Sequence, residues 1–418
     1  VISMIFKLLL FISVVSCTYA LHHSTEHTKV HHHKINRSYI EVISIVDAVS
    51  MFACMVKIHS IVESSRHKHM LSFRFLLMDN SSTAVIDNMF ASCFRGIRFE
   101  IKKWETPIAL SNIKGVGFDT SIIYSRMYLP DIFNVDKYIY IDNDVVVNAD
   151  MYNLFNLKLD VRPFDDESKR VPVSFSEIAN NQLVGKHRQI PQRQHPSTSV
   201  YSKTPAVMGF VYDRNRVNRG YLSKHLNLTH PLVKSVFRRN DPDVFFNGGV
   251  ALVDAAMWRK QGLTKKAEEL LLENREGALF NSGAIGDQGL FYLLLDRKLT
   301  TLPAVYNMRR LPNKTVRYLN QSLLGIVHFA GGFSGTGNKI VNICEHPITY
   351  PYLSSGAVPL FLSAVASLKR KCNSSYLDIP QSCTTAVSVI MDEEAAGKLK
   401  VNYNPGYGDL GWPPRVEM

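Results

Sequence analysis

The chain has 418 residues, of which 46% are hydrophobic and 20% are charged, and its formal net charge at pH 7 is +12. This composition excludes a disordered protein, because the apolar fraction is large enough to form an extensive core. The length allows one large domain or two.

Residues 1–20 have the features of a secretory signal peptide. Lys7 precedes the apolar stretch LLLFISVV, and Thr18 and Ala20 occupy the small-residue positions of a cleavage site. The apolar stretch is shorter than the ~20 residues that a spanning helix needs, so a retained membrane anchor is the weaker alternative. No later segment is long enough to span, and we expect residues 358–368 to form an amphipathic helix. We therefore predict a location in the lumen of the secretory pathway, in the Golgi or the endoplasmic reticulum, or secretion.

Sequons and cysteines agree with this location. Six Asn-x-Ser/Thr sequons occur, at Asn36, Asn80, Asn227, Asn313, Asn320 and Asn373. In an oxidising lumen, Cys372 and Cys383 are close enough in sequence to form a disulfide. Cys54 lies in an apolar helical pattern and is predicted to be a buried thiol. A nucleic-acid partner is not expected for a lumenal protein.

Residues 21–37 contain six histidines and few apolar residues. Histidines bind metals, but their spacing here fits no closed metal site. We therefore favour a solvated linker between the leader and the following domain.

From Ser38 onward, apolar runs typical of buried strands alternate with helical patterns. Strands are predicted at 39–46, 71–78, 97–104 and 136–142, and a helix at 48–65. Such alternation predicts an α/β domain with a mainly parallel central sheet, whose ligands bind beyond the carboxyl ends of the strands. Asp47 and Asp142 both follow such a strand.

The stretch YIYIDNDVVVNAD, residues 138–150, places Asp142, Asn143 and Asp144 inside an apolar run. Carboxylates cannot be buried without compensation. Two carboxylates at the end of a strand can share a divalent cation, which removes the burial penalty. A solvated turn between two strands would have the same composition, and the spacing alone does not decide between the two.

Three later segments combine apolar runs with polar residues. The predicted strand 243–254 contains Asn247 followed by two glycines, and the predicted strand 323–332 leads to His328 and two further glycines. Between them, the helix predicted at 286–298 begins with Asp287 and Gln288. A bulge, a core histidine and a capped helix would explain each segment separately, but their order along the chain points to a common site.

Together these segments resemble glycosyltransferase family 8, which includes glycogenin-like, bacterial galactosyl and glucosyl, and plant galacturonosyl enzymes. The resemblance extends from about Ile40 to about Cys344 and rests on SRMYLPDIF, YIYIDNDVVV, FNGGVALVD, GDQG and HFAG. It implies a GT-A fold, a UDP-sugar donor, a manganese or other divalent ion, and transfer with retention of anomeric configuration. A glycosyltransferase domain would then cover residues 38–345, followed by a C-terminal extension over 346–418.

The resemblance also implies roles for individual residues. The metal ligands would be Asp142, Asp144 and His328, a mixed carboxylate and imidazole set that suits manganese better than calcium. The residues near the reacting carbon would be Asp287 and Gln288. The donor-binding residues would be Asp47, Arg126, Asn143, Asn247, Gly248, Gly331 and Lys339. Arg126 lies in a helix that we predict over 120–133 and expect Pro130 to end.

The chain departs from the family pattern after His328. Family members commonly have a lysine six residues later, followed by Pro-Trp, whereas this chain has Ser334 there and its first lysine at Lys339. Either a lengthened glycine-rich loop still brings Lys339 to the phosphates, or that contact is lost. The first-strand motif also lacks its usual tyrosine, which weakens the assignment of Asp47 to the nucleotide base.

Residues 176–242 interrupt the alternation and are predicted to form a basic insertion. They contain 11 Lys and Arg against 3 Asp and Glu, an excess of eight positive charges. The segment could bind an anionic glycan or an acidic polypeptide acceptor, and a solvated insertion with a basic bias is the alternative.

The favoured function is a metal-dependent retaining glycosyltransferase that moves a hexose or uronic acid from a UDP-sugar to a glycan or glycoprotein acceptor. One alternative is a catalytically weak relative that binds nucleotide sugar or glycan, which the altered loop after His328 supports. The other is a sugar-nucleotide hydrolase with water as the acceptor.

Overall fold

The computed structural model describes residues 39–79, 83–107, 110, 123–159, 205–212, 224–239, 246–274, 278–280, 286–296, 298–309, 325–329, 357–372, 379, 381–385 and 388. They belong to one compact unit, Tyr39–Met418. The predicted leader and the histidine-rich linker lie outside the described residues, as do Gly331 and Lys339.

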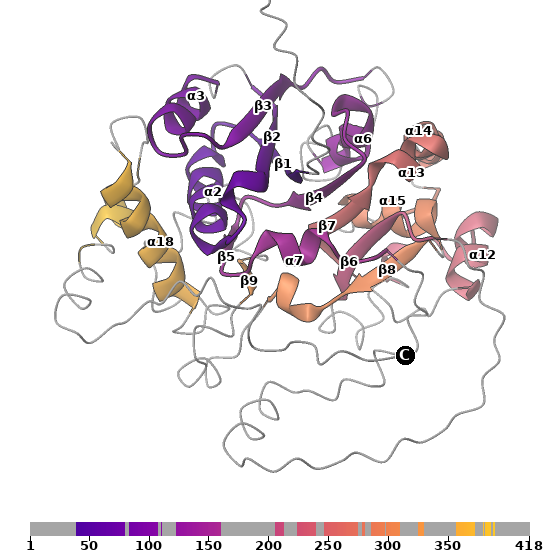
Figure 1. Cartoon of the computed structure of the whole chain (residues 1–418). Coiled ribbons are helices and arrows are strands. Elements are labelled where there is room, and N and C mark those ends of the chain that lie inside the picture. The colour runs from indigo at the N-terminus through magenta and orange to yellow at the C-terminus, as the bar shows by residue number, and fades with distance from the viewer. Residues whose placement is uncertain are drawn as a thin grey trace, which may run out of the picture. The chain divides into compact units, whose positions relative to one another are not determined.

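Seven strands of the described chain form the central sheet, in the order β3-β2-β1-β4-β7-β6-β8 (Figure 1). Their bounds are β1 Ile40–Val46, β2 Leu71–Leu77, β3 Arg98–Lys103, β4 Lys137–Ile141, β6 Met208–Tyr212, β7 Phe246–Asp254 and β8 Leu299–Leu302. Only β7 pairs antiparallel with its neighbours, β4 and β6, and the other neighbouring pairs are parallel. The predicted α/β domain with a mainly parallel sheet is confirmed.

Helices cover both faces of this sheet (Figure 1). One face carries α2 Met51–Ser64, α3 Thr83–Ser92 and α18 Ala357–Lys371. The other carries α6 Leu129–Ile132, α12 Pro231–Arg239, α13 Ala255–Lys260, α14 Leu263–Glu273 and α15 Gly286–Leu295. The shorter elements are η1 Lys68–Met70, η2 Ser125–Tyr128, α7 Met151–Phe155 and η5 Ala304–Tyr306. None of the helices described is both long and apolar enough to cross a membrane.

Strand side chains alternate between two hydrophobic cores, one on each face. In β4, Ile139 and Ile141 pack in the core that contains α2, whereas Tyr138 and Tyr140 pack in the core that contains α15. Successive side chains of a strand point to opposite faces, so a strand covered on both faces needs apolar residues throughout. This two-sided burial explains the continuous apolar runs in the sequence.

The helical structure predicted over 120–133 is confirmed for residues 123–132, which include η2 and α6. The expected stop at Pro130 is wrong, because Pro130 lies in the first turn of α6 instead of ending a helix. Proline is tolerated in a first turn, because the N–H that it lacks would have no partner within the helix there. Arg126 consequently lies on the short 3-10 helix.

Parts of the predicted basic insertion belong to the sheet and the core of the domain. Within residues 176–242, β6 is a strand of the central sheet, paired with β7 and β8. Helix α12 packs Val233 and Val236 into the core that contains α15. These parts of the segment are built into the fold, and most of the remainder lies outside the described residues.

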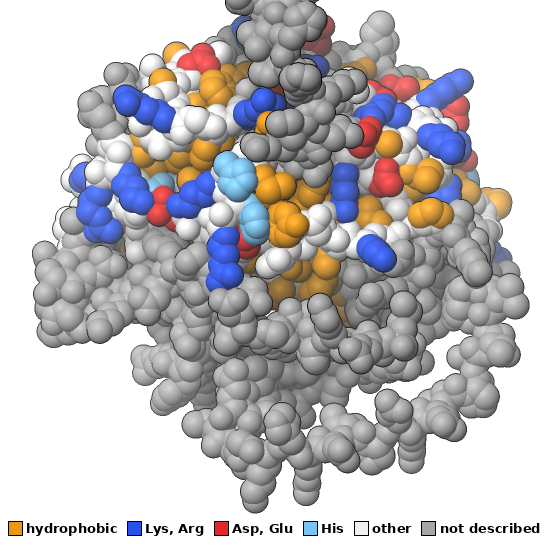
Figure 2. Space-filling view, in the orientation of Figure 1, with side chains coloured by type: hydrophobic (Ala, Val, Ile, Leu, Met, Phe, Trp, Pro, Cys, Tyr) orange, Lys and Arg blue, Asp and Glu red, His pale blue; other side chains and the backbone are white. Residues whose placement is uncertain are grey.

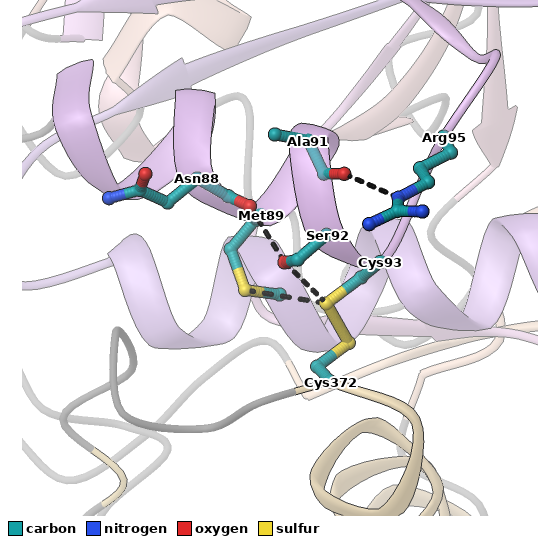
Figure 3. The surroundings of a disulfide bond; sticks show 7 residues. All are labelled: Asn88, Met89, Ala91, Ser92, Cys93, Arg95 and Cys372. Carbon is teal, nitrogen blue, oxygen red and sulfur yellow. Dashed lines mark hydrogen bonds between the residues drawn. A yellow bond between two sulfur atoms is a disulfide. The ribbon is translucent and has the colours of Figure 1, made fainter.

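A disulfide joins Cys93, directly after α3, to Cys372, directly after α18 (Figure 3). The predicted Cys372–Cys383 pair is therefore wrong, although Cys383 is itself disulfide-bonded. The observed pairing depends on tertiary packing, because α18 packs against α2 and its last turn lies beside the end of α3. The buried thiol predicted at Cys54 is confirmed.

The last turn of α18 is basic, with Lys369, Arg370 and Lys371. Lys371 forms an ion pair with Glu63 of α2, with 2.7 Å between Nζ and Oε2. Figure 2 shows Lys and Arg side chains spread over the face in view, with histidine side chains near its middle. The helix predicted at 358–368 is confirmed as part of α18, but its amphipathic character is not, because all its described side chains from Phe361 to Leu368 are buried.

Candidate active site

The site lies where the carboxyl end of β4 meets the reversed strand β7. Because β7 is antiparallel, its first residues lie beside the last residues of β4, and the Asp142 amide donates to the Gly249 carbonyl oxygen at 2.8 Å. The pairing of β7 with β6 is irregular at the same place, since Phe210 pairs with Ala251 but Val211 pairs with Asn247. The backbone at 248–250 therefore has no partner on β6, which is the geometry of a bulge.

A second, two-stranded sheet brings His328 to this edge. It pairs β5 Val145–Val147 with β9 Ile326–His328, with Val145 opposite His328. The imidazole Nε2 lies 3.2 Å from Oδ1 of Asp144 and 3.8 Å from Oδ2 of Asp142. One ligand atom from each of these three residues lies within 4.8 Å of the other two. The structure thus brings together the three residues predicted to bind metal.

The orientation of His328 fits a metal ligand. Its Nδ1 lies 2.8 Å from Oδ1 of Asn307, and Asn307 donates from Nδ2 to Oδ1 of Asn247 at 2.8 Å. Because the Asn307 nitrogen is the donor in the second bond, its oxygen accepts from Nδ1–H of the histidine. This tautomer leaves the Nε2 lone pair facing the two carboxylates. Two carboxylates and a neutral imidazole nitrogen form a donor set that suits a divalent cation.

Gly249 makes room for that imidazole. A Cβ atom at position 249 would lie 2.0 Å from Cε1 of His328, a distance that no real contact allows. A Cβ atom at Gly248 would lie 2.8 Å from Nη2 of Arg126. The paired glycines of β7 are therefore required by two side chains that approach its backbone closely.

Arg126 and Asp287 form a buried pair beside the cluster. The guanidinium donates from Nε and Nη2 to Oδ2 of Asp287, and from Nη1 to the carbonyl oxygen of Gly248. It also lies over the ring of Tyr140, 4.6 Å from the centroid. Burial raises the pKa of the Asp287 carboxyl, and the charge of Arg126 opposes part of this rise. The pair holds a cationic group 4.0 Å from Oδ1 of Asp142.

Gln288 and Asn247 bind the β7 bulge. Gln288, in the first turn of α15, accepts from the Gly248 amide at 3.3 Å. Asn247 accepts from the Gly249 amide at 3.1 Å through the same Oδ1 that receives the bond from Asn307. The predicted catalytic and donor-binding segments therefore meet at the bulge.

The remaining predicted donor-binding residues are placed differently. Asn143 points into the domain, where its Oδ1 accepts from Lys57 and its Nδ2 donates to the Ile45 carbonyl oxygen, both at 2.7 Å. Asp47 follows β1 as predicted, and its Oδ1 accepts from the Ser50 amide at 2.8 Å. Contacts of these two residues with a donor stay predictions.

The sequence did not indicate Asn307 or Lys57 as part of the site. Asn307 follows η5 in a segment without a motif, so no signal could have identified it. Lys57 had a signal, because it interrupts the otherwise apolar helical stretch MFACMVKI and is fully buried in α2.

The chain is similar to known proteins over much of its length. The profile of "Glycosyl transferase family 8" matches residues 32–333, more than half of the chain. "Probable galacturonosyltransferase-like 4" of Arabidopsis thaliana is 23% identical over 251 residues, which cover 59% of this chain and 58% of that relative. "Probable galacturonosyltransferase-like 6" of the same organism is 21% identical over 305 residues, covering 71% of this chain and 74% of that relative.

Two solved structures share the fold. The apo structure of the bifunctional glycosyltransferase WbbM has a TM-score of 0.50 at 14% identity, covering 85% of this chain and 51% of WbbM. An active-site mutant of LgtC has a TM-score of 0.50 at 14% identity, covering 83% of this chain and 100% of LgtC. The predicted GT-A fold is confirmed by this likeness.

Proposed function

The chain belongs to glycosyltransferase family 8, and we propose that it is a metal-dependent, retaining glycosyltransferase with a UDP-sugar donor. It would transfer a hexose or a uronic acid to a glycan or glycoprotein acceptor. The observation that carries this proposal is the convergence of Asp142, Asp144 and His328 within 4.8 Å at the carboxyl edge of the sheet.

The proposed cation is Mn²⁺, held by the two carboxylates and by Nε2 of His328. When bound, such an ion supplies Lewis-acid stabilisation of the negative charge that develops on the leaving diphosphate. Asn307 fixes the histidine tautomer that leaves Nε2 free for this role. The donor set and its supporting hydrogen bonds favour the proposal over a solvated turn.

Other residues of the site would bind and orient the sugar nucleotide. Arg126 places a fixed positive charge at the edge of the carboxylate cluster, where an anionic donor would be attracted. Asp287 and Gln288, at the start of α15, would position the transferred sugar against the β7 bulge. In the proposed reaction the bond from the anomeric carbon to the diphosphate oxygen breaks, and a bond to the acceptor oxygen forms on the same face. The acceptor hydroxyl proton leaves with the diphosphate.

We also propose that the enzyme works in the lumen of the secretory pathway. The Cys93–Cys372 disulfide supports an oxidising compartment, and so does the leader predicted from the sequence. An anionic acceptor remains a proposal that rests on the excess of positive charge over residues 176–242. The names of the curated relatives make a uronic acid the first donor sugar to test.

The test is a transfer assay with product analysis by mass spectrometry. Purified protein is incubated with Mn²⁺, a panel of UDP-hexoses and UDP-uronic acids, and neutral or anionic oligosaccharides. We expect one donor to add a single sugar to an oligosaccharide, and we expect a chelator to abolish the product. Free sugar released at the same rate with and without acceptor would indicate the hydrolase, and UDP binding without either product would indicate the weak relative. Asp136→Ala, which removes an exposed carboxylate, is the control for Asp144→Ala.

A further inference from the structure

Lys57 is a lysine with no exposed surface, in the middle of α2. Its Nζ donates to Oγ of Ser44 at 2.6 Å, to Oδ1 of Asn143 at 2.7 Å and to the carbonyl oxygen of Ile141 at 3.3 Å. An ammonium has three N–H groups, so its hydrogen-bonding capacity is used completely. Because burying a lysine is costly, such complete pairing indicates a defined role.

The three acceptors surround the segment that carries the carboxylates. Ser44 belongs to β1, Ile141 is the last residue of β4, and Asn143 lies between the two predicted carboxylate ligands. Asn143 is held at its other end as well, because its Nδ2 donates to the Ile45 carbonyl oxygen at 2.7 Å. Its side chain is therefore fixed inside the domain by both ends of the amide.

The charge of Lys57 also acts on the carboxylates. Burial lowers the pKa of Lys57, and Cys54, Asp142 and Asp144 oppose this change. A cation placed behind two neighbouring carboxylates reduces their mutual repulsion. Lys57 is thus linked to the carboxylate pair by hydrogen bonds through Asn143 and by charge.

We infer that Lys57 is a positioning residue for divalent-cation binding. By holding Asn143 inside the domain, its ammonium fixes the turn so that the carboxylates on either side of Asn143 face His328 together. Lys57 itself contacts neither carboxylate. The inference rests on the proposed function, since it takes the carboxylates and His328 to be the metal site.

A role confined to packing would affect stability without affecting metal affinity, and Ser60 provides the matched control. Ser60 lies one turn further along α2, and its Oγ accepts from the Val147 amide at 3.0 Å. It therefore connects the same helix to β5, directly beyond the carboxylate turn, without touching that turn. The Ser60 hydroxyl also donates to the backbone carbonyl oxygen of Lys57 at 2.7 Å. Ser60→Ala therefore removes two buried polar contacts of the helix but leaves the three hydrogen bonds of the Lys57 ammonium in place.

The experiment measures the Kd for Mn²⁺ in the absence of any sugar nucleotide, from the electron paramagnetic resonance signal of free Mn²⁺. Thermal unfolding of each variant is followed in parallel. We expect Lys57→Met to weaken Mn²⁺ binding at least tenfold and Ser60→Ala to change it less than twofold. Unchanged or tighter binding by Lys57→Met, or equal weakening in both variants, would overturn the inference. If the parent protein binds no Mn²⁺, the proposed metal site fails together with the inference. If the parent binds Mn²⁺ and Lys57→Met binds it equally well, only the inference fails, so the two failures are distinguishable.

Asn143→Ala removes the acceptor of the hydrogen bond between Lys57 and Asn143, and it remains informative if Lys57→Met does not fold. It leaves Lys57 bonded to Ser44 and Ile141, and we expect it also to weaken Mn²⁺ binding at least tenfold. Parent-like affinity in this variant would contradict the inference. Where Lys57→Met folds, the double variant should bind Mn²⁺ no more than twofold more weakly than either single variant, because both changes break one connection. Independent, multiplying effects would show that Lys57 does not act through Asn143.

Discussion

Arg126 and Asp287, which are 161 positions apart in the sequence, form a two-nitrogen ion pair with side-chain exposures of 13% and 5%. Arg126 comes from the short 3-10 helix before β4, and Asp287 comes from the first turn of α15. The sequence predicted one as a donor-binding residue and the other as a catalytic residue. In the structure they are one unit, which also binds the carbonyl oxygen of Gly248.

This pairing predicts strong energetic coupling between the two side chains. Arg126→Met should lower the free energy of unfolding by about 3–5 kcal/mol, because it leaves a buried carboxyl group without its partner. Adding Asp287→Leu should recover a large part of this loss. Urea unfolding of the parent, the two single variants and the double variant measures the coupling. Additive effects of the two changes would show that the pair does not act as a unit.

Gln288→Ala should lower kcat about tenfold or more while changing the Kd for UDP less than twofold. The reason is that Gln288 touches the β7 bulge beside the predicted position of the transferred sugar, whereas the nucleotide is assigned to other residues. A contact made mainly in the transition state affects rate without affecting ground-state affinity. Steady-state kinetics give kcat, and calorimetry gives the Kd for UDP. Equal kcat in variant and parent would remove Gln288 from the catalytic residues.

Gly249→Ala should abolish Mn²⁺ binding, because the new methyl group would displace the His328 ring that lies 2.0 Å from its position. The matched control is Gly209→Ala in β6, whose new methyl group would lie 2.8 Å from Cδ2 of Leu302, a core contact. Both variants should lose stability through crowding. Only Gly249→Ala should lose the metal, as measured by equilibrium dialysis. Metal loss in both variants would assign the effect to general destabilisation.

The protein should lose stability as the pH falls from about 6.5 towards 4 because of His59. Burial lowers the pKa of His59 to about 4, with Glu63 opposing and nearby lysines adding to the change. The unfolded chain then binds a proton between these pH values while the folded chain does not, so folding becomes less favourable by up to about 3 kcal/mol.

Replacing His59 with leucine should remove this contribution. Unfolding free energies of parent and His59→Leu, measured between pH 7.5 and 4.5, should diverge as the pH falls, with the variant losing less. Parallel profiles over the whole range would show that His59 does not titrate in this way.

The strands that position the site could be predicted because their signal is local. β1 and β4 are buried on both faces, so their apolar runs identify them, and Asp142 follows directly where the run breaks. The ligand set was predicted through the order of motifs along the chain, which the resemblance to a known family supplied. No periodicity in the sequence could have placed His328 opposite Val145.

The contacts that depend on tertiary packing could not be predicted. The Cys93–Cys372 disulfide exists because α18 returns to α2, and nothing local to either cysteine encodes that return. Asn307 orients His328 from a segment whose own residues follow no pattern. Pro130 was misassigned because a proline that begins a helical turn and one that ends a helix look alike without the surrounding structure.

The central claim is a divalent-cation site formed by Asp142, Asp144 and His328 that the nucleotide donor requires, and calorimetry of UDP binding tests it most directly. In Mn²⁺ the parent and Asp136→Ala should bind UDP with equal affinity. A chelator, or Asp144→Ala in Mn²⁺, should weaken that affinity at least a hundredfold, about 2.7 kcal/mol, because the carboxylate ligand set is then incomplete. UDP affinity that is the same with and without chelator, and the same in Asp144→Ala as in the parent, would contradict the account.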